Sequence, residues 1–267
     1  MFGVTAGAIA FADYNSDGYY DFALTGKNSN EELITYIVEN SVNRFTLKYS
    51  LQGIYFGKPA WGDYDADGDL DLVVTGQSST EGELGLGSVP VTNLYYQKED
   101  GTFDIDTTLS IDSVGISFTQ WGDYDADGDL DLFVVSGGVE CNAGDKILQD
   151  RLYINDGFGN FAKAASGLIP KINSSGSVIA AADINKDGKL ELFIGGRVVP
   201  GSYPESPRSY LLTNSGKRYI DATDNIAPEV KYSGMVTSAI FSDVDGDGWA
   251  DLLVTYEWGP IRFFQNK

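Results

Sequence analysis

The stretch Trp61–Leu72 reads WGDYDADGDLDL, and Trp121–Leu132 repeats the same twelve letters. Related stretches begin at Asp13 (DYNSDGYYD), Asp183 (DINKDGKLE) and Asp243 (DVDGDGWAD). Their first aspartates stand 50, 60, 60 and 60 residues apart, so five units account for the 267-residue chain. Self-similarity at a fixed period is the signature of a repeat architecture. We therefore predict one array of five repeats.

Each unit surrounds its acidic loop with short runs of strand-forming residues. An apolar or aromatic run precedes the loop, as in Ala239–Phe241, and a run rich in Val and Leu follows it, as in Leu130–Val135. A third run, such as Arg151–Ile154, ends in a Gly, Asn or Asp turn, and most units then have a fourth run, such as Phe45–Leu51. These runs predict strands. No window shows a sustained helical period, so we expect few helices.

The predicted fold class is all-β, because four short strands per unit are the layout of a propeller blade. We predict a single β-propeller domain over residues 1–267, with four-stranded blades at approximately 1–54, 55–114, 115–174, 175–234 and 235–267. The last unit stops after its third run, so the last blade is expected to have three strands. Five blades are enough to close a ring. We expect a closed five-bladed ring, with five blades of a larger ring as the alternative.

Composition excludes several classes of protein. The chain has 18 basic and 39 acidic residues and a formal charge of -21, so nucleic acid and anionic membranes would repel it. It has no histidine, which excludes Ser/His/Asp and Cys/His catalytic sets and His-ligated zinc. Its one cysteine, Cys141, cannot form an internal disulfide, and we expect a partly buried thiol. No apolar run of roughly 18 residues is present, so we expect no membrane insertion.

The five acidic loops carry the ligand chemistry of a hard cation. Numbered from the first aspartate, they share oxygen-bearing residues at positions 1, 3, 5 and 9 and Gly at position 6. Alternating oxygen ligands on a tight turn suit calcium. An EF-hand would place Glu at position 12, but these positions hold strand residues: Leu24, Val74, Val134, Ile194 and Val254. The acid at position 9 instead opens the second strand, so a metal would tie the first two strands of each unit together.

The five loops of the DxDxDGxxD type resemble those of FG-GAP or VCBS repeats, the repeats of integrin-α-like β-propellers. The resemblance covers essentially the whole chain. In that family each loop binds one calcium ion through the side chains at positions 1, 3, 5 and 9 and the main-chain carbonyl at position 7. The resemblance therefore implies about five calcium ions, one per blade.

Carried over residue by residue, the resemblance implies five metal sites. The first comprises Asp13, Asn15, Asp17, Asp21 and the Tyr19 carbonyl. The second comprises Asp63, Asp65, Asp67, Asp71 and the Asp69 carbonyl. The third comprises Asp123, Asp125, Asp127, Asp131 and the Asp129 carbonyl. The fourth comprises Asp183, Asn185, Asp187, Glu191 and the Lys189 carbonyl. The fifth comprises Asp243, Asp245, Asp247, Asp251 and the Trp249 carbonyl.

Two of these sites depart from the family pattern. Asn15 and Asn185 replace Asp at position 3, and Glu191 replaces Asp at position 9. These residues still offer oxygen atoms, but the first and fourth loops have fewer negative charges. We therefore predict weaker binding at these two sites.

A narrower resemblance concerns the last two units. The segments GGRVVPG (195–201), PRSYLL (207–212), DGWADLLV (247–254) and EWGPI (257–261) are similar to the propeller of cartilage-acidic-protein-like bacterial proteins.

A partner is expected on the side of the blades opposite the acidic loops. Long connections between the second and third strands lie there, at Gln77–Val91, Gly137–Gln149 and Arg197–Ser209, and long connections are often functional. Candidate ligand-binding residues in or beside such connections are Arg197, Tyr203, Arg208, Tyr256 and Trp258. The alternative is structural: Arg197 and Arg208 would pair with local acids, and Trp61 and Trp121 would pack between blades.

These features predict a non-enzymatic, calcium-stabilised extracellular module for binding or adhesion, with a protein or glycan ligand. Millimolar calcium sites of this kind would be largely empty in cytosol. Met1–Ala10 lacks the features of a signal peptide, so the chain is intracellular or its export signal lies outside this sequence. Two alternatives are a polysaccharide lyase or hydrolase that uses paired carboxylates and a purely structural repeat of a larger surface protein. No catalytic residue is predicted.

Overall fold

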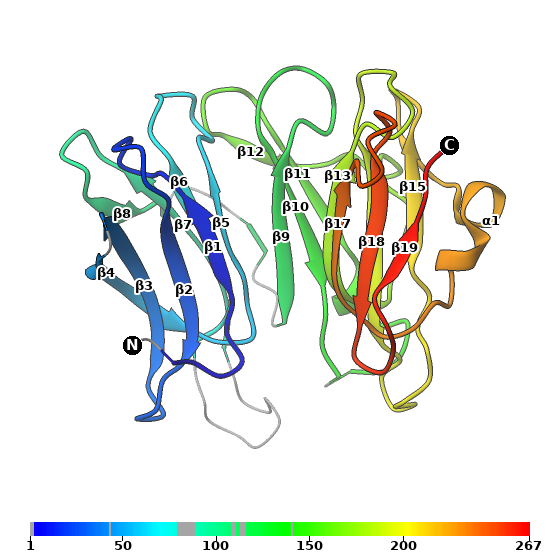
Figure 1. Ribbon diagram of the computed structural model, residues 1–267, viewed down its shortest axis with the longest axis horizontal. Helices are drawn as coiled ribbons and strands as arrows, with labels where there is room; N and C mark the ends of the chain where they lie inside the picture. Colours follow the sequence, from blue (N-terminus) through cyan, green and yellow to red (C-terminus); the bar gives the residue numbers. More distant parts are fainter. Residues whose placement is uncertain (1–2, 43, 79–88, 108–110, 113–115, 140) are drawn as a thin grey trace. The chain divides into compact units, whose positions relative to one another are not determined.

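A computed structural model of the chain describes residues 3–42, 44–78, 89–107, 111–112, 116–139 and 141–267. Within these residues the strands form five sheets in which neighbouring strands follow one another along the chain (Figure 1). Four sheets have four strands and the last has three. The all-β prediction and the three-stranded last sheet are therefore confirmed.

The strands have the following bounds. The first sheet comprises β1 (Ile9–Ala12), β2 (Asp21–Lys27), β3 (Leu33–Ser41) and β4 (Arg44–Ile54). The second comprises β5 (Pro59–Gly62), β6 (Asp71–Gln77), β7 (Pro90–Gln97) and β8 (Phe103–Ile105). The third comprises β9 (Ser117–Gly122), β10 (Asp131–Ser136), β11 (Arg151–Asn155) and β12 (Phe161–Lys163). The fourth comprises β13 (Ser175–Ala182), β14 (Glu191–Val198), β15 (Tyr210–Asn214) and β16 (Tyr219–Asp221). The fifth comprises β17 (Val236–Ser242), β18 (Asp251–Tyr256) and β19 (Arg262–Phe264).

Helices are short, as predicted. The described residues contain one α-helical turn, α1 (Thr223–Ile226), and the 3₁₀ turns η2 (Lys146–Leu148) and η3 (Pro228–Val230). None of the helices in the described part of the chain has the length and apolar character needed to cross a bilayer.

The chain divides into two compact units, and the division passes through the third repeat. One unit holds residues 1–121 and 155–161, and the other holds residues 122–154 and 162–267. The expected single propeller domain, its blade limits and the closure of a ring stay predictions.

In the first unit, the first and second sheets pack face to face through a core that includes Ala23, Ile37 and Leu72. Tyr14 stacks on Trp61, with ring centroids 5.6 Å apart and an interplanar angle of 7°. The Trp61 indole N–H also donates to the Ala10 carbonyl at 3.1 Å. This tryptophan therefore joins two sheets by stacking and by a hydrogen bond.

The same arrangement recurs one repeat later. Tyr64 stacks on Trp121 at 6.3 Å and 9°, and the Trp121 indole N–H donates to the Ala60 carbonyl at 3.2 Å. A Cβ atom at Gly62 would lie only 2.7 Å from the Trp121 ring, so the close approach requires glycine. The alternative that Trp61 and Trp121 pack between sheets is confirmed.

In the second unit, the fourth and fifth sheets share an aliphatic and aromatic core. Val178 and Phe193 of the fourth sheet cluster with Val236, Leu252 and Val254 of the fifth. The second strand of every sheet is buried along most of its length. This double-sided burial explains why these strands read as nearly continuous apolar runs rather than as an alternating pattern.

The structure describes the three predicted long connections to different extents. Residues 79–88 of the Gln77–Val91 connection lie outside the described residues. The Gly137–Gln149 connection contains η2 and the half-buried Cys141, whose burial is as expected for that thiol. The Arg197–Ser209 connection starts inside β14 and runs to β15.

Candidate metal centres

Each acidic loop joins the first and second strands of its sheet. Its carboxylates accept hydrogen bonds from backbone N–H groups of the same loop and so stabilise the turn. In the second loop, Asp63 Oδ1 accepts the Asp67 N–H at 3.1 Å and Asp63 Oδ2 accepts the Gly68 N–H at 3.1 Å. The first, third and fourth loops repeat both bonds, from position 1 to positions 5 and 6. Asp67 Oδ1 in turn accepts the Asp69 N–H at 2.9 Å. The acids at positions 1 and 5 are thereby held inside the turn.

The loop backbone turns twice through the left-handed region. In the second loop Gly68, at position 6, has a φ of 97° and Ala66, at position 4, has a φ of 59°. Only glycine adopts such a φ without steric cost, and another L-residue there costs roughly 1–2 kcal/mol. Four loops nevertheless carry a residue other than glycine at position 4 with positive φ, namely Ser16, Ala66, Ala126 and Lys186, and the fifth carries Gly246. The hydrogen bonds within the loop must therefore stabilise this left-handed conformation.

Three of the loops gather carboxylate oxygens into one small volume. The sets are Asp63, Asp65 and Asp71; Asp123, Asp125 and Asp127; and Asp243, Asp245 and Asp251. Within each set the oxygens lie within 4.8 Å of one another. Because Ca–O distances are about 2.3–2.6 Å, oxygens on opposite sides of one calcium ion lie about this far apart. Each set is thus compatible with a shared cation.

The acid at position 9 is buried in every loop, at 0–1% exposure: Asp21, Asp71, Asp131, Glu191 and Asp251. In the second sheet Asp71 Oδ2 accepts the Tyr64 N–H at 3.2 Å, and Asp71 Oδ1 accepts the Gln97 N–H at 2.9 Å. Tyr64 belongs to the loop and Gln97 ends β7. One carboxylate therefore connects the loop, the second strand and the third strand.

Burial makes these carboxylates unfavourable as isolated anions. It raises the pKa of Asp71 to about 7, although two backbone N–H groups favour the ionised form. Burial also raises the pKa of Asp21 and of Glu191. Asp21 Oδ2 is buried and has no hydrogen-bond partner among the described residues. A cation in the loop would offset this desolvation, so the donor set and the orphaned oxygen fit calcium.

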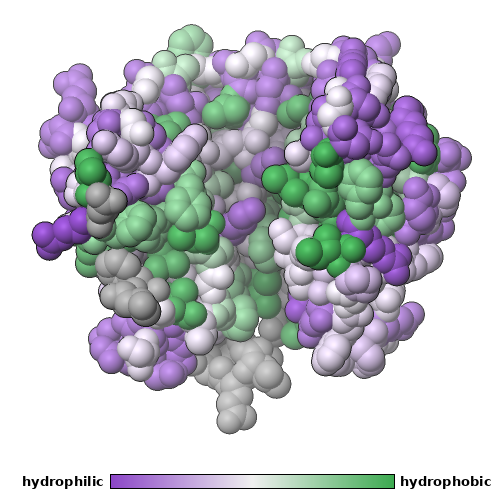
Figure 2. All heavy atoms as spheres, in the orientation of Figure 1, coloured by the Kyte–Doolittle hydropathy of each residue, from purple (hydrophilic) through white to green (hydrophobic). Residues whose placement is uncertain are grey.

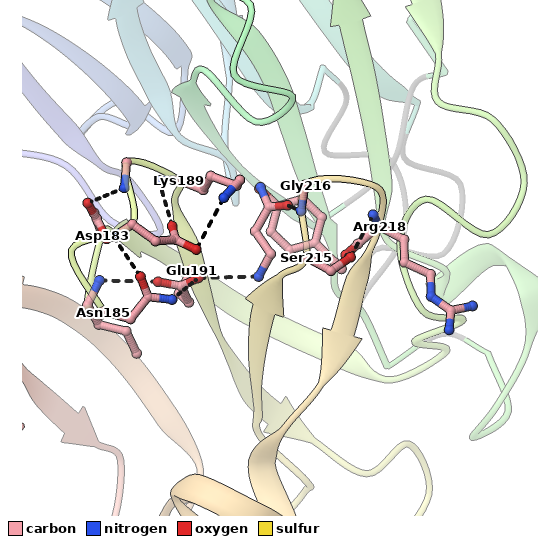
Figure 3. Close-up of polar contacts among 12 residues, drawn as sticks. Asp183, Asn185, Lys189, Glu191, Ser215, Gly216 and Arg218 are labelled. Carbon is pink, nitrogen blue, oxygen red and sulfur yellow. Dashed lines mark hydrogen bonds and ion pairs between the residues drawn. The ribbon is translucent and has the colours of Figure 1, made fainter.

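Figure 3 shows the polar contacts of the fourth loop. The Asn185 amide donates to Glu191 Oε1 at 3.2 Å, and the same oxygen accepts the Asn214 N–H at 3.3 Å. Lys189 Nζ lies 3.2 Å from Asp187 Oδ2. Two predicted ligands, Asp187 and Glu191, therefore accept from side chains of their own loop, and weaker cation binding at this loop stays a prediction.

A repeated amide bond connects each loop to the sheet that follows it in the chain. The side-chain amide at or just after the end of a third strand donates to the main-chain carbonyl at position 2 of the preceding loop. The four bonds are Gln97 to Tyr14 at 3.3 Å, Asn155 to Tyr64 at 2.7 Å, Asn214 to Tyr124 at 3.2 Å and Asn266 to Ile184 at 2.7 Å. The sequence prediction missed these residues. Their recurrence at the end of every third run is the signal that could have found them.

Three of the predicted ligand-binding residues meet beside Glu257, which the sequence prediction did not include. The Trp258 indole N–H donates to the Tyr203 hydroxyl at 2.9 Å, and this hydroxyl donates to Glu257 Oε1 at 3.3 Å. The Arg197 guanidinium pairs with the other Glu257 oxygen. Trp258 is 73% exposed and Tyr203 is 57% exposed. We call Arg197, Tyr203, Glu257 and Trp258 the aromatic cluster.

The other two predicted ligand-binding residues lie elsewhere. Arg208 pairs with Asp221 at 2.7 Å and with Asp224 at 3.4 Å, as the structural alternative expected. Tyr256 is buried in the core between the fourth and fifth sheets. The aromatic cluster is therefore the exposed part of the predicted set.

Comparison with known proteins finds a repeat family that is similar to the middle of the chain. The FG-GAP-like repeat family matches residues 63–134 and 123–194, which include the second, third and fourth acidic loops. No curated protein matches the chain. Among solved structures, the chain is similar to the V. cholerae biofilm matrix protein Bap1, with 17% identity and a TM-score of 0.46. That match covers 95% of this chain and 35% of Bap1, so the chain spans about a third of Bap1's length.

Proposed function

We propose that this chain, which carries FG-GAP-like repeats, is a calcium-stabilised, non-enzymatic binding module that works outside the cell. The five sheets act as β-propeller blades, and calcium ions in the acidic loops hold the first two strands of each sheet together. A protein or glycan ligand binds at the end of the sheets opposite these loops.

The observation that carries this proposal is the burial of an acid at position 9 in all five loops. A solvated acidic turn has no reason to bury a carboxylate, since burial penalises the charged form. In each loop, positions 1, 3 and 5 supply further oxygen ligands close to this acid in the sequence. Calcium would be bound by the side chains at positions 1, 3, 5 and 9, and its positive charge would offset the acidic charge of the loops.

The charge and the free energy that calcium binding would contribute support a structural role for the metal. The predicted ligand positions hold 20 of the 39 acidic residues, and five divalent ions would change the formal charge from -21 to about -11. With a dissociation constant of about 0.1–1 mM and free calcium at ten times that value, each site contributes about 1.4 kcal/mol. Five sites contribute about 7 kcal/mol, which is comparable with the roughly 5–15 kcal/mol net stability of a domain.

The aromatic cluster supports the ligand part of the proposal. It lies in the Arg197–Ser209 connection and in the turn after β18, at the end of each sheet remote from the acidic loop. Arg197 neutralises Glu257, so the exposed Trp258 and Tyr203 rings are the available contact surface. Exposed aromatic and Arg side chains are common anchors in binding interfaces.

The experiment is thermal unfolding of the whole chain in millimolar calcium and in excess chelator. We expect the melting temperature to fall by well over 5 °C on chelation, because about 7 kcal/mol is withdrawn. Asp127→Asn should reduce the calcium-dependent part by about one site, whereas Glu229→Gln, an exposed acid outside the loops, should leave it unchanged. A chelation shift of only a degree or two would contradict the calcium role. Calcium-dependent cleavage of a polysaccharide would contradict the non-enzymatic role.

A further inference from the structure

One residue near the end of the third strand is an asparagine in four of the five sheets and a glutamine in the second sheet. In four sheets its backbone N–H donates to the buried acid at position 9: Asn40 to Asp21 at 2.7 Å, Gln97 to Asp71 at 2.9 Å, Asn214 to Glu191 at 3.3 Å and Asn266 to Asp251 at 2.9 Å. Asn155 ends the third strand of the third sheet. Gln97 is therefore the exception at a place where the other repeats have the shorter amide.

In the third and fourth sheets, the turn after the third strand satisfies the oxygen of this amide. Asn155 Oδ1 accepts the Gly159 N–H at 3.1 Å, and Asn214 Oδ1 accepts the Gly216 N–H at 2.8 Å. The nitrogen of each amide donates to the carbonyl of the preceding acidic loop. Both ends of these amides therefore have partners inside the protein, as buried polar groups normally do.

In the second sheet the amide oxygen has no such partner. The turn glycine, Gly101, instead donates its N–H to the Lys98 carbonyl at 2.7 Å. Gln97 is 6% exposed, and its Oε1 is buried without a hydrogen-bond partner among the described residues. The orientation of the amide is set by its nitrogen, which donates to the Tyr14 carbonyl at 3.3 Å. A buried acceptor without a donor is unfavourable, so a donor from a bound molecule would stabilise this site.

Gln97 lines a polar cavity of about 360 Å³ that lies within the first unit. The first sheet and its loop contribute Tyr14, Glu39 and Lys48, and the second sheet contributes Lys98 with the turn that follows β7. The cavity is therefore at the end of the sheets that carries the acidic loops. Figure 2 shows mainly hydrophilic residues over this end of the first unit, at the upper left. The volume is in the range of roughly 300–1,000 Å³ that small-molecule sites have.

The charges around the cavity disfavour an anion and a metal ion. Its lining contains four acids and two lysines, so it repels anions. Both lysines are paired, Lys48 with Glu39 at 3.0 Å and Lys98 with Asp104 at 3.0 Å. The sets of gathered carboxylates found among the described residues lie in the acidic loops, and none of their members lines this cavity. The site therefore suits a ligand without net charge.

The polar groups of the lining suit neighbouring hydroxyl groups on one small molecule. Glu39 Oε1 accepts from the Tyr14 hydroxyl at 2.8 Å and from the Lys48 ammonium at 3.0 Å. An ammonium has three N–H groups, so Lys48 can donate to a ligand while it keeps this pair. A hydroxyl group both donates and accepts, so two adjacent hydroxyls can serve Gln97 and Lys48 together. The half-buried Tyr49 adds an aromatic wall, which the C–H face of a sugar ring can contact.

We propose that the cavity beside Gln97 binds a neutral sugar, with Gln97 Oε1 as the acceptor for one hydroxyl and Lys48 as the donor to another. This site goes beyond the proposed function, because it belongs to the first unit, whereas the aromatic cluster belongs to the second. A cavity with few contacts should bind weakly, with a dissociation constant on the order of 1 mM. Such binding is lost on washing, so it is measured in solution rather than by capture on an array.

The test is titration of the isotope-labelled whole chain with sugars in millimolar calcium, followed by nuclear magnetic resonance. The probes are glucose, galactose and mannose and the disaccharides maltose, lactose and cellobiose. We expect at least one of them to cause a saturable shift of the Gln97 side-chain amide signal. The spectrum of the Gln97→Asn variant, which lacks this signal, identifies it.

Gln97→Asn gives the second sheet the residue that the other sheets have, so the fold should be kept while the acceptor is withdrawn from the cavity. Sugar affinity, read from backbone signals of the turn after β7, should fall about five- to tenfold for the loss of one hydrogen bond. Gln52→Asn is the matched control, because it shortens an exposed glutamine of the same unit outside the cavity. Lys48→Met should weaken binding to a similar extent, and Lys217→Met, at an exposed lysine of the second unit, should not.

Three results would overturn the proposal. The absence of a saturable shift with every sugar would show that the cavity holds only water. Sugar binding that Gln97→Asn and Lys48→Met leave unchanged would lie elsewhere on the protein. Saturation by triglycine but by none of the sugars would assign the cavity to peptides. Trp258→Ala should leave the sugar affinity of this cavity unchanged, so failure of this site and failure of the aromatic cluster are distinguishable.

Discussion

The side-chain amide of Asn155 donates a 2.7 Å hydrogen bond to the main-chain carbonyl of Tyr64, which lies 91 residues earlier in the chain. Tyr64 occupies position 2 of the second acidic loop and is 5% exposed, so water has little access to its neighbourhood. Each acidic loop from the first to the fourth is held in this way by the sheet that follows it.

Asn155→Ala should therefore destabilise the protein by about 1–3 kcal/mol, because it leaves a buried carbonyl without a donor. Urea unfolding of dilute protein in calcium measures this. Asn40→Ala is the matched control: its amide bonds to an exposed site of its own sheet, so we expect a change below about 0.5 kcal/mol. Equal effects of the two substitutions would mean that the inter-sheet bond has no special weight.

Asn185→Asp should tighten calcium binding at the fourth loop several-fold, on the order of three- to tenfold. The substitution adds a charged ligand and removes the amide that now donates to Glu191. In chelator the same variant should be less stable than the native chain, because acidic repulsion grows. Calorimetric titration with calcium gives the affinity. Asn30→Asp adds the same charge on an exposed turn, and it should leave both quantities almost unchanged.

Trp258→Ala should abolish ligand capture without loss of stability. Its side chain is 73% exposed, so removal should change the free energy of unfolding by less than about 0.5 kcal/mol. Binding to an immobilised glycan and protein array, with and without the substitution, measures capture. Trp61→Ala is the contrasting variant, because loss of its stack and hydrogen bond should cost about 3–5 kcal/mol. Undiminished capture by the Trp258 variant would remove the aromatic cluster from the site.

Because of Asp150, the free energy of unfolding should decrease as the pH rises above about 4. The residue is 2% exposed, and burial raises the pKa of its carboxyl well above the ordinary value, although Ser136 donates to it at 2.9 Å. A raised folded-state pKa means that stability is fully present below the unfolded pKa of about 3.9 and declines as pH rises toward the folded pKa. Asp150→Asn should flatten this decline. Unfolding free energies between about pH 4 and 8 in saturating calcium measure it.

Asp156→Asn provides the control of opposite sign. The Asn160 amide and the Phe158 N–H lower the pKa of this exposed carboxyl, so its contribution is present above the unfolded pKa and is lost as pH falls. The two variants should therefore change the pH profile in opposite directions. Parallel changes would contradict the assignment of the decline to Asp150.

The repeat made most of the fold predictable from sequence. The near-constant spacing of the acidic loops, of 50 or 60 residues, predicted all five sheets. The fourth strands were harder, because β8, β12 and β16 have only three residues each and show no resolvable alternation. The positions of the acidic residues within each loop were also predictable, because the loop is folded by hydrogen bonds between residues two to five apart in the sequence.

The contacts between sheets were not predictable in this way. Asn214 follows an apolar run and precedes Ser-Gly, so in sequence it looks like a turn residue, and its bond to Tyr124 depends on a partner 90 residues away. Likewise Tyr256 and Trp258 look alike as aromatic residues near a turn, yet one is buried in the core and the other is exposed. Whether a residue is buried depends on how neighbouring sheets pack against each other, and the local sequence pattern does not contain that information.

The inter-sheet amide bonds also set an order in which the loops can close during synthesis of the chain. Each bond spans 82 to 91 residues, and its donor always comes later in the chain than its acceptor. A newly synthesised loop must therefore wait for more than one further repeat to emerge before it is fully closed. The first four loops should therefore close in chain order, each after the third strand of the following repeat has been synthesised.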